Sequence, residues 1–225
     1  MVPKLSKRLT FILKFIPPYA DVFYDLCCDH GYLGIAVAHT YSYSSVNLID
    51  QIPSIMEKVS NKIKGSYIPT KTKITSTCLD ARKIRIKNDG INVVSIAGIG
   101  GELTIKIIDS LLLQLKSTDI LVLSAHNNIH KLRQYLINNN FNLVKEGLVK
   151  DNGKFYEVLV LRYRKSQKSN IGLVFCNSDD LSSNIDVLGY YDEQIAYLEN
   201  KVLYNPNSNY EEIIKSYSAS KSKIN

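Results

Sequence analysis

Four aspartates stand at or just beyond the ends of three short stretches that each read as a strand. Asp25 and Asp29 close the first run, Asp50 the second and Asp80 the third. An acid after the second strand is placed to accept both hydroxyls of a ribose, and an acid after the third can reach the amino group of an adenine. Each acid alone could instead cap a helix or form a turn. Three strand ends in register favour one shared site for a ligand that contains adenosine.

The first two acids belong to the stretch Val22–Gly34, which reads as a strand, a tight turn and the start of a helix. Such junctions bind nucleotides in α/β proteins. A dinucleotide site needs G-x-G-x-x-G, and Cys27 stands where the first glycine would be, which argues against NAD. S-adenosylmethionine has no pyrophosphate to bring against the backbone, and its cationic sulfur suits an acidic turn. We expect Asp29 and the amide of Gly31 to hold its amino-acid end.

The elements that must position these acids alternate along the chain. Apolar residues at helical spacing predict a first helix over residues 4–16, which Pro17 and Pro18 end. The predicted helices that follow are Tyr32–Thr40, Pro53–Gly65, Glu102–Leu115 and Ile129–Asn139, and the predicted strands are Ser45–Ile49, Lys73–Thr77, Ile91–Ile96 and Asp119–Leu123. The alternation is typical of an α/β fold with a mostly parallel sheet.

The pattern changes after residue 140. Two strand-like runs, Phe141–Lys150 and Lys154–Arg164, flank an Asp-Asn-Gly turn and predict an antiparallel hairpin at the edge of the sheet. A helix is expected from about Asp180 to Leu203, and the serine- and lysine-rich end, Lys215–Asn225, is expected to fray. The predicted division is a domain over residues 1–165 and a short, partly helical extension over residues 166–225.

Composition narrows the class of protein. The 225 residues carry a net charge of +7, which favours an anionic partner such as a nucleic acid or a lipid surface. No run of apolar residues is long enough for a membrane span, and charged residues interrupt the N-terminus, so we expect a cytoplasmic protein that makes no use of a membrane. The four cysteines form neither a zinc pattern nor a disulfide framework, so we expect reduced thiols and no metal.

The basic residues cluster in runs that begin near Lys4, Arg82 and Arg162, with tyrosines such as Tyr156 available for stacking. Phosphate contacts and aromatic stacking are what an enzyme that acts on RNA needs. Each run could equally be a solvated loop.

Several motifs, taken in order, match one family. They are L-S-K-R-L (Leu5–Leu9), D-x-x-x-D-H-G-Y-L (Asp25–Leu33), I-A-G-I-G-G-E-L (Ile96–Leu103) and L-R…F-x-L-V-x-E-x-L-V…F-Y-E-V-L-V (from Leu132-Arg133 to Val160). From about Leu5 to Leu161 the chain resembles the bacterial tRNA adenine-22 N1-methyltransferase family, in a C-C-D-H-G form similar to its proteobacterial branch. The resemblance implies a Rossmann-like class I methyltransferase fold, a three-layer α/β sandwich. It also implies S-adenosylmethionine as cofactor and tRNA as partner, with methyl transfer to N1 of an adenine.

The predicted site residues follow from the acids, the basic runs and these motifs. The glycines of I-A-G-I-G-G replace the N-P-P-Y type of loop, and they let a flat base approach the backbone closely. The predicted cofactor-binding residues are Asp25, Cys27, Asp29, Gly31, Asp50, Gln51, Asp80, Ala81, Ala97 and Gly98. The predicted substrate-binding residues are Arg8, Gly100, Gly101, Arg82, Lys83, Arg85 and Tyr156. Asp29, His30 and His126 are the candidate catalytic residues, as acceptors for the proton that N1 methylation makes acidic.

Three features depart from the family pattern. Cys27 replaces a glycine, Ser124-Ala125-His126 replaces a Q-P-N-like motif, and the chain has only a short region where family members often carry a helical hairpin. Two alternatives therefore stay open. One is a cofactor-binding module that recognises RNA or protein, with lost or redirected catalysis, and the other is a methyltransferase for a different RNA or a small molecule.

Overall fold

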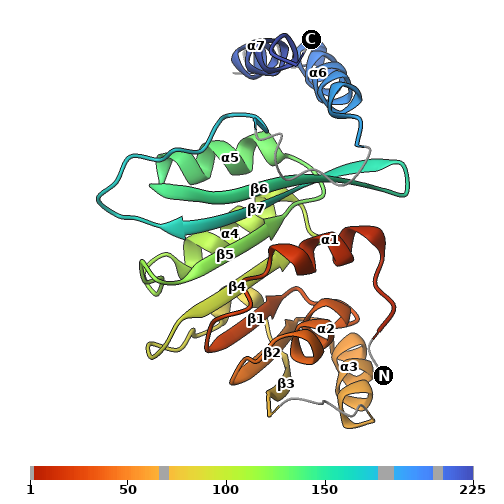
Figure 1. Ribbon diagram of the computed structural model, residues 1–225, viewed down its shortest axis with the longest axis vertical. Coiled ribbons are helices and arrows are strands. Elements are labelled where there is room, and N and C mark those ends of the chain that lie inside the picture. Colours follow the sequence, from red (N-terminus) through yellow and green to blue (C-terminus); the bar gives the residue numbers. More distant parts are fainter. Residues whose placement is uncertain (1–2, 66–70, 177–184, 205–209, 225) are drawn as a thin grey trace.

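The structure is a computed structural model of the 225-residue chain, and it describes residues 3–65, 71–176, 185–204 and 210–224. Its strands are β1 (Val22–Leu26), β2 (Ser45–Asp50), β3 (Lys73–Cys78), β4 (Asn92–Ala97), β5 (Ile120–Ser124), β6 (Phe141–Asp151) and β7 (Lys154–Tyr163). They form one seven-stranded sheet in the order β3-β2-β1-β4-β5-β7-β6 (Figure 1). The first five strands are parallel, and β7 runs antiparallel to β5 and β6. The mostly parallel sheet with a terminal hairpin is therefore confirmed.

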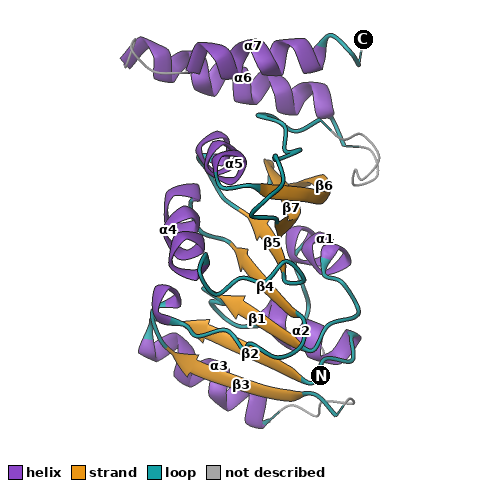
Figure 2. Ribbon diagram, turned by 90° about the vertical axis from the view of Figure 1, so that its left-hand side faces the viewer, coloured by secondary structure: helices purple, strands orange, loops and turns teal. Residues whose placement is uncertain are grey.

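Helices cover both faces of this sheet. They are α1 (Lys7–Phe15), α2 (Tyr32–Thr40), α3 (Pro53–Lys64), α4 (Gly101–Leu111) and α5 (Ile129–Asn138), with the 3₁₀ turn η1 (Ala81–Lys83) after β3. Figure 2 shows α4 and α5 on one face and α1 and α2 on the other. One buried cluster joins the sheet to α4 and α5, and a second joins it to α1, α2 and α3. The predicted three-layer sandwich is confirmed.

Local chemistry fixes the first helix and the first strand. The Ser6 hydroxyl accepts a hydrogen bond from the Leu9 amide at 3.2 Å and caps α1, and the prolines after Ile16 prevent its extension. All five residues of β1 are buried, because a central parallel strand is covered on both faces. Because β1, β2, β4 and β5 are parallel, their carboxyl ends meet at one edge of the sheet, and the candidate site lies at this edge.

The C-terminal region is more ordered than its composition suggests. Helices α6 (Val187–Tyr204) and α7 (Tyr210–Lys221) lie side by side beyond α5 and β6 (Figures 1 and 2). Ile213 and Tyr217 are one turn apart on α7 and are buried against Tyr190 and Leu198 of α6. The prediction of a frayed end from Lys215 is thus wrong as far as Lys221, because pairing with α6 gives α7 an apolar core.

Other boundaries differ slightly. Helix α4 ends at Leu111 instead of Leu115. The residues that follow form a tighter turn, in which the Gln114 amide donates a hydrogen bond to the Leu111 carbonyl at 2.8 Å. The helix expected from about Asp180 begins at Val187 in the described part, and Asp180 itself lies outside the described residues. The division of the chain at residue 165 stays a prediction. In the described ranges, no helix combines the length and the apolar character needed to cross a bilayer.

Candidate active site

The turn between β1 and α2 has an alternating left-handed backbone. Cys27, Asp29 and Gly31 have φ angles of 59°, 48° and 70°. The turn is held by hydrogen bonds from the Cys28 amide to the Ile49 carbonyl at 3.0 Å and from the Gly31 amide to the Cys28 carbonyl at 2.8 Å. A positive φ strains residues other than glycine. Cys27 therefore has the left-handed backbone conformation that favours glycine.

We expect Cys27→Gly to leave the turn intact, because glycine adopts this conformation without strain. Cys27→Val should destabilise the protein by about 1–3 kcal/mol, since a β-branched residue tolerates a positive φ poorly. Urea unfolding of both variants measures the difference, with Cys78→Val in the strand β3 as control. If valine at residue 27 is as well tolerated as glycine, the strain assigned to this turn is wrong.

Two buried carboxylates lie under this turn. The Asp25 carboxylate accepts a hydrogen bond from the Gly34 amide at 2.9 Å. The Asp50 carboxylate accepts one from the Asp29 amide and one from the Ile52 amide, each at 3.1 Å. Asp50 therefore ties the end of β2 to the β1 turn, and its oxygens keep lone pairs for further donors.

Burial raises the pKa of Asp25 to about 7, with a smaller contribution from the charge of Asp50. Between the ordinary pKa of 3.8 and this value, the folded protein holds a proton that the unfolded chain has released. The free energy of unfolding should therefore fall as pH rises from about 4 through 7, by about 4 kcal/mol in total from this group. Asp25→Asn should remove this slope in urea unfolding measured across that range. Equal slopes for the parent protein and the variant would contradict the assignment.

The loop after β4 is bound to the loop after β5. The Gly98 amide donates to the Ser124 carbonyl at 3.1 Å, the His126 amide to the Ile99 carbonyl at 2.8 Å and the Gly101 amide to the Asn127 carbonyl at 3.0 Å. Gly98 has a φ of 87°, and a Cβ atom at Gly101 would lie 2.7 Å from the Asn128 carbonyl oxygen. The glycines are thus required by this close pairing of two loops.

A group of three side chains stands above these loops. The Arg8 guanidinium lies 5.0 Å from the centre of the Tyr156 ring, and its Nη1 is 2.5 Å from Nε2 of His126. Arg8 comes from α1, whose Arg8 amide donates to the Asp151 carboxylate at 3.0 Å. Burial, Arg8 and then Lys154 lower the pKa of His126. His126 is therefore neutral, and its Nε2 accepts the hydrogen bond from Arg8.

These parts enclose a first cavity of about 310 Å³, in the size range of ligand sites. Acids from the ends of β1 and β2 line one side, and Arg8 and His126 lie over β4 and β5. The predicted residues that line it are Arg8, Asp25, Cys27, Asp29, His30, Asp50, Ala97, Gly98 and His126. The structure thus brings together nine predicted residues from five separate segments.

The other predicted residues lie outside this lining. Asp80 caps η1, and its carboxylate accepts a hydrogen bond from the Arg82 side chain. This bond, and a second one from the Arg82 amide, lower the pKa of Asp80 to about 2. Tyr156 touches the cavity only through Arg8 and His126. The remaining residues outside the lining are Gly31, Gln51, Ala81, Gly100, Gly101, Lys83 and Arg85.

Sequence reasoning missed the apolar part of the lining. Leu9, Ile52, Ile55 and Ile99 line the cavity beside the acids, and so does Tyr32. Leu9, Tyr32 and Ile99 lie within the quoted motifs, so position in a motif was the available signal for them. Ile52 and Ile55 lie at the start of α3, outside every motif. In the described ranges, no three histidine, cysteine or acidic side chains gather closely enough to hold a metal ion.

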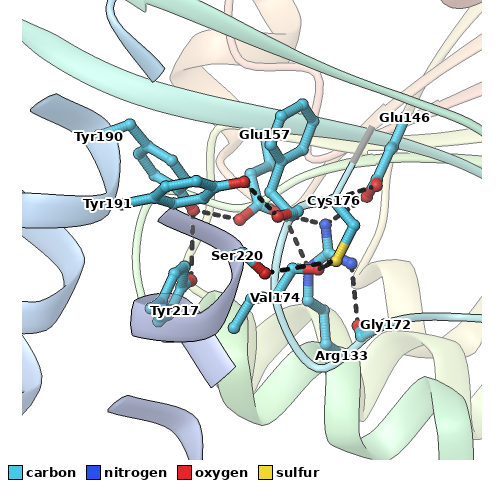
Figure 3. A network of polar contacts seen from close by, with 11 residues as sticks. Arg133, Glu146, Glu157, Gly172, Val174, Cys176, Tyr190, Tyr191, Tyr217 and Ser220 are labelled. Atoms are coloured by element: carbon cyan, nitrogen blue, oxygen red, sulfur yellow. Dashed lines mark hydrogen bonds and ion pairs between the residues drawn. The ribbon is translucent and has the colours of Figure 1, made fainter. Parts of the chain in front are cut away.

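A second polar group, shown in Figure 3, joins this domain to the C-terminal helices. Arg133 is fully buried and donates to Glu157 at 2.8 Å from Nε and to Glu146 at 2.5 Å from Nη2. The Tyr190 hydroxyl of α6 donates to Glu157 and lies 3.4 Å from the Tyr217 hydroxyl of α7. We call Arg133, Glu146, Glu157, Tyr190 and Tyr217 the arginine clamp. It fixes the helical pair to α5, β6 and β7.

The comparisons with known proteins agree with this architecture. The methyltransferase domain family matches residues 5–159. The chain is 27% identical to tRNA (adenine(22)-N(1))-methyltransferase of Bacillus subtilis (strain 168) over 165 residues, which are 70% of this chain and 64% of that protein. The chain thus spans less than two thirds of that relative's length.

Two solved structures share the fold over nearly the whole chain. M. capricolum TrmK in complex with S-adenosyl-homocysteine has a TM-score of 0.75 at 15% identity and covers 98% of this chain and 99% of its own. The m1A22 tRNA methyltransferase TrmK of B. subtilis has a TM-score of 0.69 at 19% identity and covers 97% and 96%. These likenesses extend through the helical pair. The family match covers more than half of this chain, and the two solved structures share its fold. From the family match we conclude that the chain belongs to the methyltransferase domain family.

Proposed function

We propose that this protein transfers a methyl group from S-adenosylmethionine to N1 of an adenine in tRNA. The observation that carries the proposal is the first cavity, with three acids over β1 and β2 and with Arg8 and His126 over β4 and β5. The B. subtilis relative, a tRNA (adenine(22)-N(1))-methyltransferase, supports this substrate. This activity requires a protein in the cytoplasm, because tRNA is found there.

The residues of the cavity fit this cofactor. Asp50 has lone pairs left after its two backbone hydrogen bonds, so it can accept from ribose hydroxyls. Asp29 lines the cavity and would hold the amino-acid end. The Gly31 amide is already bonded to the Cys28 carbonyl, and Gln51, Asp80 and Ala81 lie outside the lining. The acidic turn suits a sulfonium cation, and the left-handed Gly98 leaves the backbone open beside Ala97.

When bound, the cofactor supplies an electrophilic methyl group to the lone pair of N1. The chain's own contribution is to orient the adenine and to exclude water. Asp29 and His30, whose ionisable groups lie 3.9 Å apart, are the candidate proton acceptors. The basic nitrogen of His126 already accepts from Arg8, so we assign His126 a positioning role beside Tyr156.

The RNA would approach across the basic side of the site. Arg8 has its guanidinium on Tyr156, which forms a platform of charge and aromatic surface at the cavity. Gly100 and Gly101 are occupied by the loop after β5, so the base would approach beside Gly98, which lines the cavity. Arg82, Lys83 and Arg85 are exposed after β3 and would contact phosphates.

Label from methyl-tritiated S-adenosylmethionine tests this proposal. We expect the purified protein to label unmodified tRNA transcripts, and we expect ribonuclease to remove the label. Calorimetric binding of the cofactor without any transfer would instead support a binding module. Label that survives ribonuclease and appears in small molecules would support a small-molecule methyltransferase. The left-handed backbone at Cys27 is one that glycine would also adopt, and this favours the methyltransferase over the binding module.

A further inference from the structure

A second cavity of about 300 Å³ lies beside the first. It is formed by the loop between β5 and α5, the start of β7 and the helix α6. In the described part of the chain, His126 is the single residue that lines both cavities. His126 thus borders both cavities.

The walls of the second cavity combine flat rings with hydrogen-bonding groups. Phe155 and Tyr197 supply aromatic surface, and Asn127 and Gln194 supply amides that can donate and accept. Lys154 adds a positive charge at the same place. Proteins recognise unstacked RNA bases with this combination, through ring stacking, edge hydrogen bonds and a nearby cation.

One polar atom in this wall lacks a partner. The His130 side chain is buried, with 5% of the residue exposed, and its Nε2 atom makes no hydrogen bond with the described residues. Burial, then Lys131 and Lys201, lower the pKa of His130 to about 4, so the ring is neutral near pH 7. Buried polar atoms without a partner are rare in native proteins, and a ligand is one way to satisfy them.

The second cavity and the arginine clamp share two residues. Glu157 and Tyr190 line the cavity, and both belong to the clamp (Figure 3). The Tyr190 hydroxyl donates to Glu157, so the α6 wall of the cavity is hydrogen-bonded to its β7 wall.

We propose that the second cavity binds an unstacked nucleobase of the tRNA that neighbours the target adenine. The target itself must enter the first cavity to meet the methyl group, and His126 borders both cavities, so the base of an adjacent nucleotide is the one within reach of the second. This inference rests on the proposed function, because it takes RNA as the substrate.

Equilibrium binding of tRNA transcripts tests the proposal without requiring catalysis. The transcripts are intact or carry a single abasic site at each nucleotide that flanks the target adenine. The proteins are the parent, Tyr197→Ala and the matched control Tyr204→Ala, which changes an exposed tyrosine of the same helix outside the cavity. Methyl transfer to the same transcripts is measured in parallel.

We expect Tyr197→Ala to weaken binding of intact tRNA about ten-fold, and Tyr204→Ala to leave it unchanged. At one flanking position, the abasic site should weaken binding to the parent about ten-fold and add nothing to the effect of Tyr197→Ala. The proposal would be overturned if, at every flanking position, the loss of affinity from the abasic site multiplied with the loss from Tyr197→Ala. Equal tRNA affinities of Tyr197→Ala and Tyr204→Ala would also overturn it. Transfer without this coupling overturns the base site alone, and coupling without transfer overturns the proposed function alone. If the parent binds no tRNA, both fail.

Discussion

Arg133→Met is expected to lower the free energy of unfolding by about 3–5 kcal/mol. Arg133 is the one cation of the arginine clamp, and it lies between the buried carboxylates of Glu146 and Glu157. Methionine fills much of the space but removes the positive charge that both carboxylates share. Urea unfolding followed by circular dichroism measures the loss.

Lys131→Met is the matched control for this variant. Lys131 lies on the same helix and pairs with Glu102 at 2.7 Å, but both side chains are exposed, so little stability should be lost. Adding Glu146→Gln and Glu157→Gln to Arg133→Met should recover part of the stability, since two buried negative charges are removed. The role of the clamp would be refuted by a loss at residue 133 no larger than the loss at residue 131.

The loss should also depend on pH. Burial already raises the pKa of Glu157 in the parent, although the charge of Arg133 opposes the shift. Without Arg133 the pKa of Glu157 should rise further. The deficit of Arg133→Met should therefore shrink as pH falls, because protonation neutralises the buried Glu157 carboxylate.

The second large effect is expected on cofactor affinity. Asp50→Ala should weaken binding of S-adenosylmethionine by about 2–3 kcal/mol, through the loss of charge-assisted hydrogen bonds to the ribose. The side chain also holds the Asp29 amide, so the variant removes an organiser of the turn as well as a ligand contact. Isothermal titration calorimetry gives the affinity, and a thermal melt of each variant confirms that it is folded.

Asp80→Ala is the informative comparison. Asp80 also follows a strand of the parallel sheet, but it lies outside the first cavity and is held by Arg82. We expect it to weaken the cofactor far less than Asp50→Ala. Unchanged affinity in a folded Asp50→Ala protein would remove Asp50 from the ribose site.

Much of the fold could be predicted from the sequence, because its signals are local. Helical and strand-like spacing identified the elements, and the Asp-Asn-Gly turn identified the hairpin of β6 and β7. The C-terminal helix α7 was missed because its burial of Ile213 and Tyr217 depends on a partner helix. A short serine- and lysine-rich segment carries no such information by itself.

The site was predicted in part for the same reason. Asp25, Asp29 and Asp50 follow directly from the rule that parallel strands end at one edge, and the structure confirms that they line one cavity. Asp80 follows the same rule, but Arg82, only two residues away, holds its carboxylate outside the lining. Local pairing thus overrode the topological expectation at that strand.

Long-range contacts were beyond sequence reasoning. Arg133, Glu146 and Glu157 all lie in the last motif of the family resemblance, yet nothing in the motif says that they form one buried ion group. The bond between Arg8 and His126 likewise joins residues 118 positions apart. It changes the chemistry expected of His126 from proton acceptor to positioning residue.

The most direct test of the proposed function is the identity of the methylated nucleoside. Unmodified tRNA that has reacted with the protein and S-adenosylmethionine is digested to nucleosides and analysed by mass spectrometry, and reverse transcription maps the modified position. We predict 1-methyladenosine at a single adenine, absent when Asp50→Ala replaces the parent at limiting cofactor. Methylation at another atom or another base, or no methylated nucleoside from a protein that binds the cofactor, would contradict the account.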